Sequence, residues 1–247
     1  MSNELFMYAG SDVLVLGLGV VAACDLRPKQ AIPAKGHWEL ERQQMVDLLR
    51  HYGIQDPRIL TVMGSIPRHL FIPEAFRNPD TAYGDFPCPI GHEQTISQPF
   101  IVAYMTEKLG IKPGDKILEI GTGSGYQAAV LAGLGAHVYS VEIIPALAEQ
   151  AQAVLSRMGY TNEVHVRLGD GYHGWPEEAP FDAVIVTCAP EAVPETLVGQ
   201  LREGGVMIVP TGVWMEQRLV ILHKKNERIE KMDDLPVRFV PMVRAKQ

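Results

Sequence analysis

The stretch LEIGTGSGY, residues 118–126, decides the fold that we expect for this 247-residue chain. The short apolar segment at residues 116–120 has the length and composition of a buried strand. Glycines then occupy every second position, and an apolar helix over residues 126–134 is expected to follow. Glycine tolerates positive φ and lets a ligand approach the backbone, so this turn is either a binding loop or a plain strand-to-helix turn. The glycines are Gly121, Gly123 and Gly125.

Short apolar strands alternate with helical segments from this loop onward. We expect strands at residues 116–120, 137–141, 164–168, 183–186 and 206–209, and helices at residues 126–134, 145–158 and 195–201. This alternation indicates a parallel sheet with helices on both faces. The apolar stretches 219–223 and 237–243 leave little room for a helix between them and predict an antiparallel hairpin. The predicted fold class is therefore α/β: a Rossmann-like, doubly wound sheet, mostly parallel, with a C-terminal antiparallel hairpin and N-terminal helices.

The part of the chain that precedes the glycine loop is organised differently. Apolar residues at helical spacing predict helices over residues 39–52 and 57–63. Residues 67–99 are rich in Pro, Gly and aromatic residues, which predicts an irregular segment of the kind that carries function in compact domains. We expect residues 1–36 to be an extension that ends in a linker, and residues 37–247 to form the main domain.

The extension contains an apolar run, residues 13–23, that is too short to span a bilayer but has the length of a signal-peptide core. It leads into Cys24 in the manner of a bacterial lipoprotein cleavage site. No Lys or Arg precedes Arg27, however, whereas Glu4 and Asp12 are acidic, and a secretory signal begins with positive charge. We therefore expect a cytoplasmic protein, with export or a lipid anchor on Cys24 as the alternative. Stable membrane association is expected only if this segment is a lipoprotein signal.

The overall charge and the cysteines argue against several classes of function. The chain has 22 Lys and Arg against 29 Asp and Glu, a formal net charge of −7, and such a surface repels nucleic-acid phosphates. We thus expect no nucleic-acid partner. The three cysteines lie far apart without CxxC spacing, which predicts neither a disulfide framework nor a zinc site. No other spacing of His and acidic residues predicts a metal site.

Acidic residues near the ends of three successive predicted strands indicate what the loop binds. Glu119 lies two positions before Gly121, where a carboxylate would repel a pyrophosphate but attract a sulfonium and an amino group. Glu142 ends the next strand, 21 residues after Gly121, and can accept hydrogen bonds from both ribose hydroxyls or act as a helix N-cap. Asp170, followed by Gly171, can accept from an adenine amino group or form an ordinary Asp-Gly turn. Together these acids favour S-adenosyl-L-methionine over a dinucleotide as the cofactor.

The chain resembles the protein-L-isoaspartate O-methyltransferases over about residues 39–245. The matching stretches are IPR (66–68), FI (71–72), AY (82–83) with Asp85, PIG (89–91), QTISQP (94–99), the loop 118–126, GDG (169–171), APFDA (179–183) and VRFVP (237–241). The stretch QTISQP is highly specific. The resemblance implies methyl transfer from S-adenosyl-L-methionine to the free carboxylate of L-isoaspartyl residues, and of D-aspartyl residues, in damaged proteins. Its substrates are then isoaspartyl-containing proteins and peptides, whose repair the reaction initiates.

The resemblance also implies roles for residues on the substrate side. Ser97 corresponds to the serine taken as the family's active-site residue, with an ST-turn before Gln98-Pro99 as the alternative reading. The residues expected to bind the cofactor are Gln94, Thr95, Glu119, Gly121, Thr122, Gly123, Gly125, Glu142, Asp170 and Gly171. The residues expected to bind the substrate are Ile96, Phe239, Val240 and Pro241.

The chemistry of this reaction requires few catalytic groups. A carboxylate is already ionised and nucleophilic at pH 7, so its methylation needs no general base. Opposite charges cancel as the new bond forms, and the enzyme is therefore expected to act by in-line positioning and exclusion of water. A neutral hydroxyl such as that of Ser97 can orient the carboxylate without holding it as firmly as a lysine would.

One position departs from the family pattern, in which a Gly-x-Gly-Gln run precedes the threonine. This chain has GHEQ at residues 91–94, so Glu93 replaces the second glycine. Its bulk and negative charge are expected to weaken peptide binding rather than change the reaction. Alternatively, Glu93 points to solvent or pairs with a cation such as Lys108 or Arg238.

Two other functions stay open at this point. The first is a small-molecule or nucleic-acid methyltransferase of the same fold, which the acidic charge and the QTISQP stretch disfavour. The second is a non-catalytic binder of damaged proteins, which Glu93 keeps open. Residues 187–190 lack the Asn/Asp-Pro-Pro-Tyr pattern of amino-group methyltransferases, which argues against adenine or glutamine N-methylation.

Overall fold

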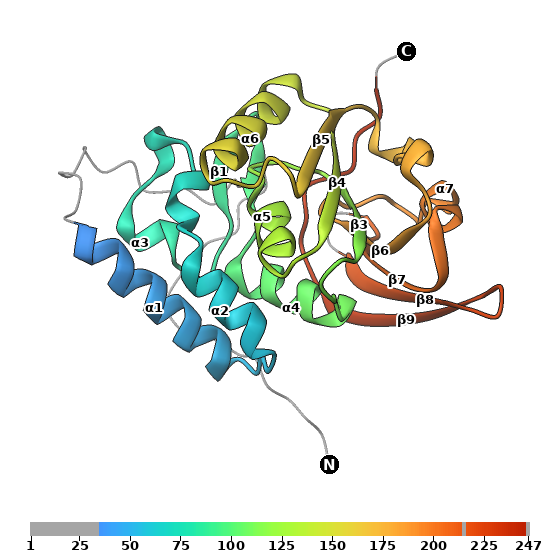
Figure 1. Ribbon diagram of the computed structural model, residues 1–247, viewed down its shortest axis with the longest axis horizontal. Helices are drawn as coiled ribbons and strands as arrows, with labels where there is room; N and C mark the ends of the chain where they lie inside the picture. The colour runs from blue at the N-terminus through green and yellow to red at the C-terminus, as the bar shows by residue number, and fades with distance from the viewer. Residues whose placement is uncertain (1–34, 214–215, 246–247) are drawn as a thin grey trace. The chain divides into compact units, whose positions relative to one another are not determined.

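The computed structural model describes residues 35–213 and 216–245. A seven-stranded sheet runs through this part of the chain in the order β5-β4-β3-β6-β7-β8-β9 (Figure 1). Neighbouring strands from β5 to β7 are parallel, whereas β8 and β9 pair antiparallel. The predicted class, α/β and mostly parallel with a C-terminal antiparallel hairpin, is confirmed. The strands are β3 (Lys116–Ile120), β4 (His137–Glu142), β5 (Val164–Leu168), β6 (Phe181–Val186), β7 (Leu201–Thr211), β8 (Arg218–Lys225) and β9 (Arg228–Pro236).

The helices include both predicted N-terminal ones and, besides the short α3 within the segment that was expected to be irregular, one longer helix that the sequence pattern did not reveal. That helix, α4, has Pro99 at its first position and Gly110 at its end, where the glycine adopts φ +62°. Proline at the start and a left-handed glycine at the end are ordinary boundaries of a helix. The helices are α1 (Lys35–His51), α2 (Pro57–Ser65), α3 (Pro79–Ala82), α4 (Pro99–Leu109), α5 (Tyr126–Gly133), α6 (Pro145–Arg157) and α7 (Glu195–Gly199).

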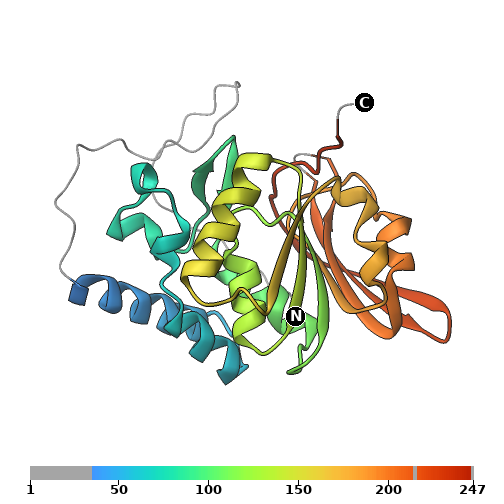
Figure 2. The ribbon, with the colours of Figure 1, turned by 45° about the horizontal axis from the view of Figure 1, so that its top comes forward.

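The two faces of the sheet bury two separate apolar clusters. Side chains alternate between faces along a strand, so Ile117 and Ile208 belong to one cluster, and Leu118 and Met207 to the other. The larger cluster lies under α4, α5 and α6, with α1 and α2 packed outside them. The smaller cluster lies under α7 and short 3-10 turns, and Figure 2 shows α7 across the sheet from α6. Helices therefore cover both faces of the sheet, but one face carries more helices and a larger apolar cluster than the other.

The C-terminal hairpin uses a different second strand from the one predicted. Residues 219–223 lie within β8 as expected, but β8 pairs with β9, and residues 237–243 form no strand of the sheet. Hydropathy missed β9 because it is an exposed edge strand, RIEKMDDLP, without an apolar face. Residues 237–243 instead cross the end of the sheet, with one parallel bridge between Ala189 and Pro241. This crossing brings the C-terminal segment to the functional site.

The segment that was expected to be irregular, residues 67–99, contains short elements and a hairpin. It includes the 3-10 turns η1 (Arg68–Phe71) and η2 (Glu74–Phe76), the helix α3, and a two-stranded hairpin of β1 (Cys88–Gly91) and β2 (Gln94–Ile96). Two further 3-10 turns, η3 (Gly171–His173) and η4 (Pro176–Glu178), follow β5. The hairpin lies next to the glycine loop, because Ile90 Cδ1 is 3.5 Å from where a Cβ on Gly123 would be.

The N-terminal part of the chain is described only from Lys35. Helix α1 begins there, inside the stretch that was expected to be linker. The lipoprotein-like segment that ends at Cys24 lies outside the described residues. No helix within residues 35–213 and 216–245 is long and apolar enough to cross a membrane.

Candidate functional site

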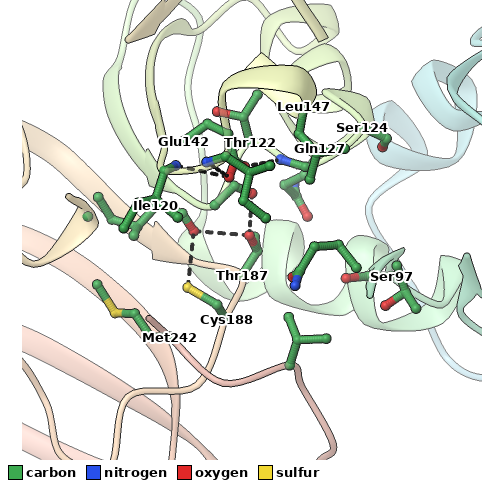
Figure 3. A pocket seen from close by; sticks show the side chains of 18 of the residues that line it. Ser97, Ile120, Thr122, Ser124, Gln127, Glu142, Leu147, Thr187, Cys188 and Met242 are labelled. Carbon is green, nitrogen blue, oxygen red and sulfur yellow. Dashed lines mark hydrogen bonds between the residues drawn. The ribbon is translucent and has the colours of Figure 1, made fainter. Parts of the chain in front are cut away.

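A pocket opens at the carboxyl end of the parallel strands, where the direction of strand addition reverses. From β3 the chain adds β4 and β5 on one side and later β6 and β7 on the other, so the ends of β3 and β6 diverge in the middle of the sheet. Ligands of open α/β sheets bind at this switch point. Residues from the ends of β3, β4 and β6, from β2 and from the C-terminal segment line the pocket. Figure 3 shows Ser97 across this pocket from Cys188 and Met242.

The glycine loop forms the floor of the pocket. Gly121, Gly123 and Gly125 adopt φ values of +93°, +53° and +83°, which side chains other than glycine rarely adopt. Gly121 and Gly123 line the pocket together with Thr122. Gly125 does not line it, and instead lets α5 pack closely on Leu155, which lies 3.1 Å from where a Cβ would be. Only the first two glycines thus present backbone to a ligand.

Glu142 holds this loop to the end of β4. Its Oε2 accepts the N–H of Gly123 at 2.8 Å, and its Oε1 accepts the N–H groups of Ile143 and Ile144 at 2.9 and 3.0 Å. The side chain is buried but lines the pocket. A carboxylate has about four lone-pair sites, so these three donors leave room for about one strong hydrogen bond from a ligand hydroxyl.

Glu119 lies behind the loop rather than in the pocket. It is fully buried, and its Oε2 accepts from Ser140 Oγ at 2.5 Å, while its Oε1 has no hydrogen-bond partner in the described part of the chain. Burial, assisted by the negative charge of Glu142, raises the pKa of Glu119 to about 8. The carboxyl is therefore mostly neutral at pH 7, which corrects the expectation of a charged group facing a sulfonium. Its connection to the pocket is indirect, because Ser140 Oγ lies 2.6 Å from Thr122 Oγ1.

Asp170 caps the η3 turn and also holds the C-terminal segment. Its Oδ1 accepts the N–H of Tyr172 at 2.9 Å, and its Oδ2 accepts the N–H of Ala245 at 3.1 Å. Asp170 does not line the pocket, so the geometry favours the turn over a contact with adenine. Gly171 does line it, and a Cβ there would lie 2.5 Å from Ile120 Cγ2, too close for any side chain.

The predicted substrate side forms the opposite wall. Gln94, Thr95 and Ile96 come from β2, Ser97 follows directly, and all four line the pocket. The next residues are held by Asp85, whose Oδ2 accepts from Gln98 Nε2 at 2.7 Å and whose Oδ1 accepts the N–H of Phe100 at 2.8 Å. Ser97 therefore sits between a hydrogen-bonded hairpin and a helix whose first turn is held by Asp85.

The C-terminal segment closes a third side of the pocket. Val240 and Pro241 line it as predicted, whereas Phe239 is buried beneath them and does not. The backbone of Phe239 is held at both ends by one side chain. Its N–H donates to Gln217 Oε1 at 2.7 Å, and its carbonyl accepts from Gln217 Nε2 at 3.2 Å.

Several lining residues escaped prediction from the sequence. Thr187 follows β6 and donates from Oγ1 to the carbonyl of Gly121 at 2.6 Å, and its neighbour Cys188 lines the same edge. Burial raises the pKa of the Cys188 thiol to about 12, so it carries no thiolate at pH 7. Both residues directly follow β6, the strand that pairs with β3, and this position could have indicated that they line the pocket. The other unpredicted lining residues are Val102, Ile120, Ser124, Tyr126, Gln127, Val141, Ile143, Ile144, Leu147, Met242 and Val243.

Glu93 lies at the tip of the β1–β2 hairpin, exposed and outside the pocket lining. Both turn residues are left-handed, with φ +52° at His92 and +58° at Glu93. Two such residues in a two-residue hairpin loop ordinarily require Asn or Gly. The family's glycine at the position of Glu93 would adopt this left-handed conformation without strain, whereas the glutamate of this chain is strained there.

The pocket suits a molecule with both a flat apolar part and a polar part. Ile143, Ile144 and Leu147 supply an apolar surface, whereas the backbone of the glycine loop and the carboxylate of Glu142 supply hydrogen bonds. This combination of an apolar surface and hydrogen-bonding groups fits the adenine, ribose and amino-acid parts of S-adenosyl-L-methionine. Among the described residues, no three His, Cys, Asp or Glu side chains gather in a way that could hold a metal ion.

Comparison with known proteins agrees with this geometry. The family model for protein-L-isoaspartate(D-aspartate) O-methyltransferase matches residues 40–247. A protein-L-isoaspartate O-methyltransferase of Gloeobacter violaceus is 53% identical over 204 residues, covering 82% of this chain and 98% of that protein. One from a Synechococcus strain is 52% identical over 212 residues, covering 82% and 85%.

Solved structures give the same family. A protein-L-isoaspartate O-methyltransferase structure matches with a TM-score of 0.74 and 33% identity, covering 81% of this chain and 65% of that one. A second, from Plasmodium falciparum in complex with S-adenosyl-L-homocysteine, matches with a TM-score of 0.71 and 26% identity, covering 82% and 98%.

Proposed function

Since the chain belongs to the protein-L-isoaspartate(D-aspartate) O-methyltransferase family, we propose that its pocket at the sheet edge holds both the methyl donor and the carboxylate to be methylated. The enzyme transfers a methyl group from S-adenosyl-L-methionine to the free carboxylate of L-isoaspartyl residues in damaged proteins, which initiates their repair. The observation that supports the site is the continuity of one pocket, which joins the glycine loop and Glu142 to Ser97.

Bound S-adenosyl-L-methionine supplies an electrophilic methyl group on a sulfonium. The residues of the chain then have to bind, orient and keep dry a carboxylate that is already ionised. Ile96, Val240 and Pro241 provide apolar walls that exclude water from the reacting groups. Ser97 provides a neutral donor that directs one carboxylate oxygen without neutralising it.

At the cofactor end of the pocket, the proposed role of each residue follows from its capacity to form hydrogen bonds. Gly121, Thr122 and Gly123 present backbone groups to the amino-acid part, and Glu142 accepts from a ribose hydroxyl. Gln94 and Thr95 complete this end from the hairpin. Glu119, Gly125 and Asp170 act behind the pocket, where they hold the loop, α5 and the C-terminal segment.

We further propose that the substrates include peptides as well as proteins, that D-aspartyl residues are accepted, and that no nucleic acid is bound. A cytoplasmic location is supported by the acidic residues before Arg27, with lipid attachment at Cys24 as the alternative. Residues 37–247 are proposed as the methyltransferase domain and residues 1–36 as its extension. Membrane fractionation of cells that express the full chain, beside a Cys24→Ser variant, tests the location. If the full chain is recovered with membranes and the Cys24→Ser variant is not, the lipid anchor is established.

Amide hydrogen exchange with and without S-adenosyl-L-homocysteine tests the site directly. We expect protection in peptides that cover residues 119–127, 142–147 and 240–243. Peptides from α1, which contributes nothing to the pocket, serve as the internal control. Protection that spares all three pocket segments would contradict the proposed site.

A further inference from the structure

One arginine connects two walls of the pocket from behind. Arg68, in η1, is fully buried. Its Nη2 donates to the carbonyl of Ser97 at 2.9 Å, and its Nε donates to the carbonyl of Ala82 at 2.9 Å. Its guanidinium carbon lies 4.9 Å from the ring centroid of Tyr126, the first residue of α5, which lines the pocket. One side chain thus joins Ser97, α3 and the helix that follows the glycine loop.

Holding a cation in this position is energetically unfavourable. Burial of an unpaired charge is strongly unfavourable, because the charge loses its hydration. Within residues 35–213 and 216–245 no carboxylate lies within ion-pair distance of Arg68, and its Nη1 has no hydrogen-bond partner. Asp85 attracts it electrostatically but is already occupied by Gln98 and Phe100. The compensation therefore comes from the two carbonyls and the aromatic ring.

Arginine suits this task because of its shape. Its planar fork presents several donors in fixed directions, so it can hold two carbonyls from separate segments at once, and charge-assisted bonds are stronger than neutral ones. A lysine has one nitrogen and cannot reproduce that geometry. Ser97 is thereby held on two sides, with Arg68 on its carbonyl and Asp85 on the residues that follow.

We propose that Arg68 is a positioning residue for methyl transfer, which fixes the Ser97 backbone so that the Ser97 hydroxyl meets the substrate carboxylate in the reactive orientation. This inference rests on the proposed role of Ser97. It follows that damage to Arg68 should lower turnover more than it weakens binding, because a misplacement of about 1 Å can cost roughly a hundredfold in rate.

The test uses Arg68→Lys, which keeps the charge and loses the fork. With isoaspartyl peptide we expect kcat to fall about ten- to a hundredfold, with KM and the affinity for S-adenosyl-L-homocysteine within about threefold of wild type. The matched control is Arg77→Lys. Arg77 is half-buried in the same region and donates Nε and Nη2 to the carbonyl of Ile72 at 3.0 and 2.9 Å, but it does not line the pocket. Its kcat should stay within twofold of wild type.

A double-mutant cycle separates this inference from the role of Ser97. If Arg68 acts through Ser97, Arg68→Lys should have little further effect on kcat in a Ser97→Ala background. Additive losses, an equal loss in Arg77→Lys, or wild-type kcat in Arg68→Lys would each overturn the proposal. Full activity of Ser97→Ala would refute the role of Ser97 itself, and with it the route by which Arg68 is proposed to act. Should Arg68→Lys fail to bind S-adenosyl-L-homocysteine, Arg68→Gln, which also removes the fork but leaves a neutral side chain in the buried site, replaces it in the same cycle. Coupling to Ser97→Ala supports the proposal, and additivity overturns it.

Discussion

Replacing Glu119 by Gln removes a buried carboxyl group whose tendency to lose its proton should make the protein less stable as pH rises. The pKa of Glu119 is raised from 4.5 to about 8 in the folded chain, chiefly by burial. Between these two values the unfolded chain releases the proton and the folded chain retains it. Folding is then weakened by about 1.4 kcal/mol for each pH unit. The loss begins near the unfolded pKa, is complete above the folded pKa, and totals about 5 kcal/mol.

Glutamine keeps the shape and an acceptor for Ser140 but cannot titrate. The stability of Glu119→Gln relative to wild type should therefore increase by about 3 kcal/mol between pH 5.5 and pH 8.5. Urea unfolding at several pH values measures this difference, in which titrating groups that do not interact with Glu119 cancel. Gln150→Ala, an exposed change on α6 at a side chain that does not titrate, is the control and should show a flat difference. Parallel pH curves for Glu119→Gln and wild type would refute the reasoning, and would restore a charged carboxylate behind the loop.

Substitutions at three further positions test individual parts of the site. Ser97→Ala should lower turnover of isoaspartyl peptide about ten- to a thousandfold, since positioning effects have this size. The affinity for S-adenosyl-L-homocysteine, measured by calorimetry, should stay the same. Undiminished turnover would show that Ser97 takes no part in the reaction. Glu142→Ala should weaken cofactor binding by about 1.5–3 kcal/mol, the range for hydrogen bonds to a charged group. Glu142→Gln, which keeps a carbonyl for the Gly123 N–H, should lose less, and unchanged binding in both would leave Glu142 a purely structural residue. Glu93→Gly should stabilise the chain against thermal unfolding by about 1 kcal/mol, because it relieves a left-handed side chain, whereas Glu93→Gln should not. A Michaelis constant for isoaspartyl peptide that falls severalfold at low salt in both Glu93 variants would show that charge matters as well.

The glycine loop and the succession of strands and helices after it could be predicted because they depend on local features. Residues 118–126 combine an apolar run with alternate glycines, and the alternation of strands and helices follows from short-range periodicity. The hairpin was predicted with the wrong second strand because the apolar residues of β9 do not alternate along the strand, and β9 gains its place largely by backbone pairing with β8. Helix α4 was missed although Pro99 and Gly110 mark its boundaries.

The site was harder to predict, because a sequence does not show which side of a strand faces a ligand. Glu119 and Glu142 both lie near the ends of central strands, yet only Glu142 reaches the pocket. Asp170 is bound by the N–H of Ala245, which is 75 residues away in the chain, a contact that no local pattern predicts. Thr187 and Cys188 lie at the pocket because β6 neighbours β3, a pairing between distant segments.

The most direct measurement incubates the protein with methyl-labelled S-adenosyl-L-methionine and one peptide prepared in an aspartyl and an isoaspartyl form. We expect label to enter only the isoaspartyl form, as an ester that alkali releases. Equal labelling of the two forms would contradict recognition of the isomerised carboxylate. Binding of S-adenosyl-L-methionine without label in either peptide would instead indicate a non-catalytic binder, and would contradict the methyl transfer on which the account depends.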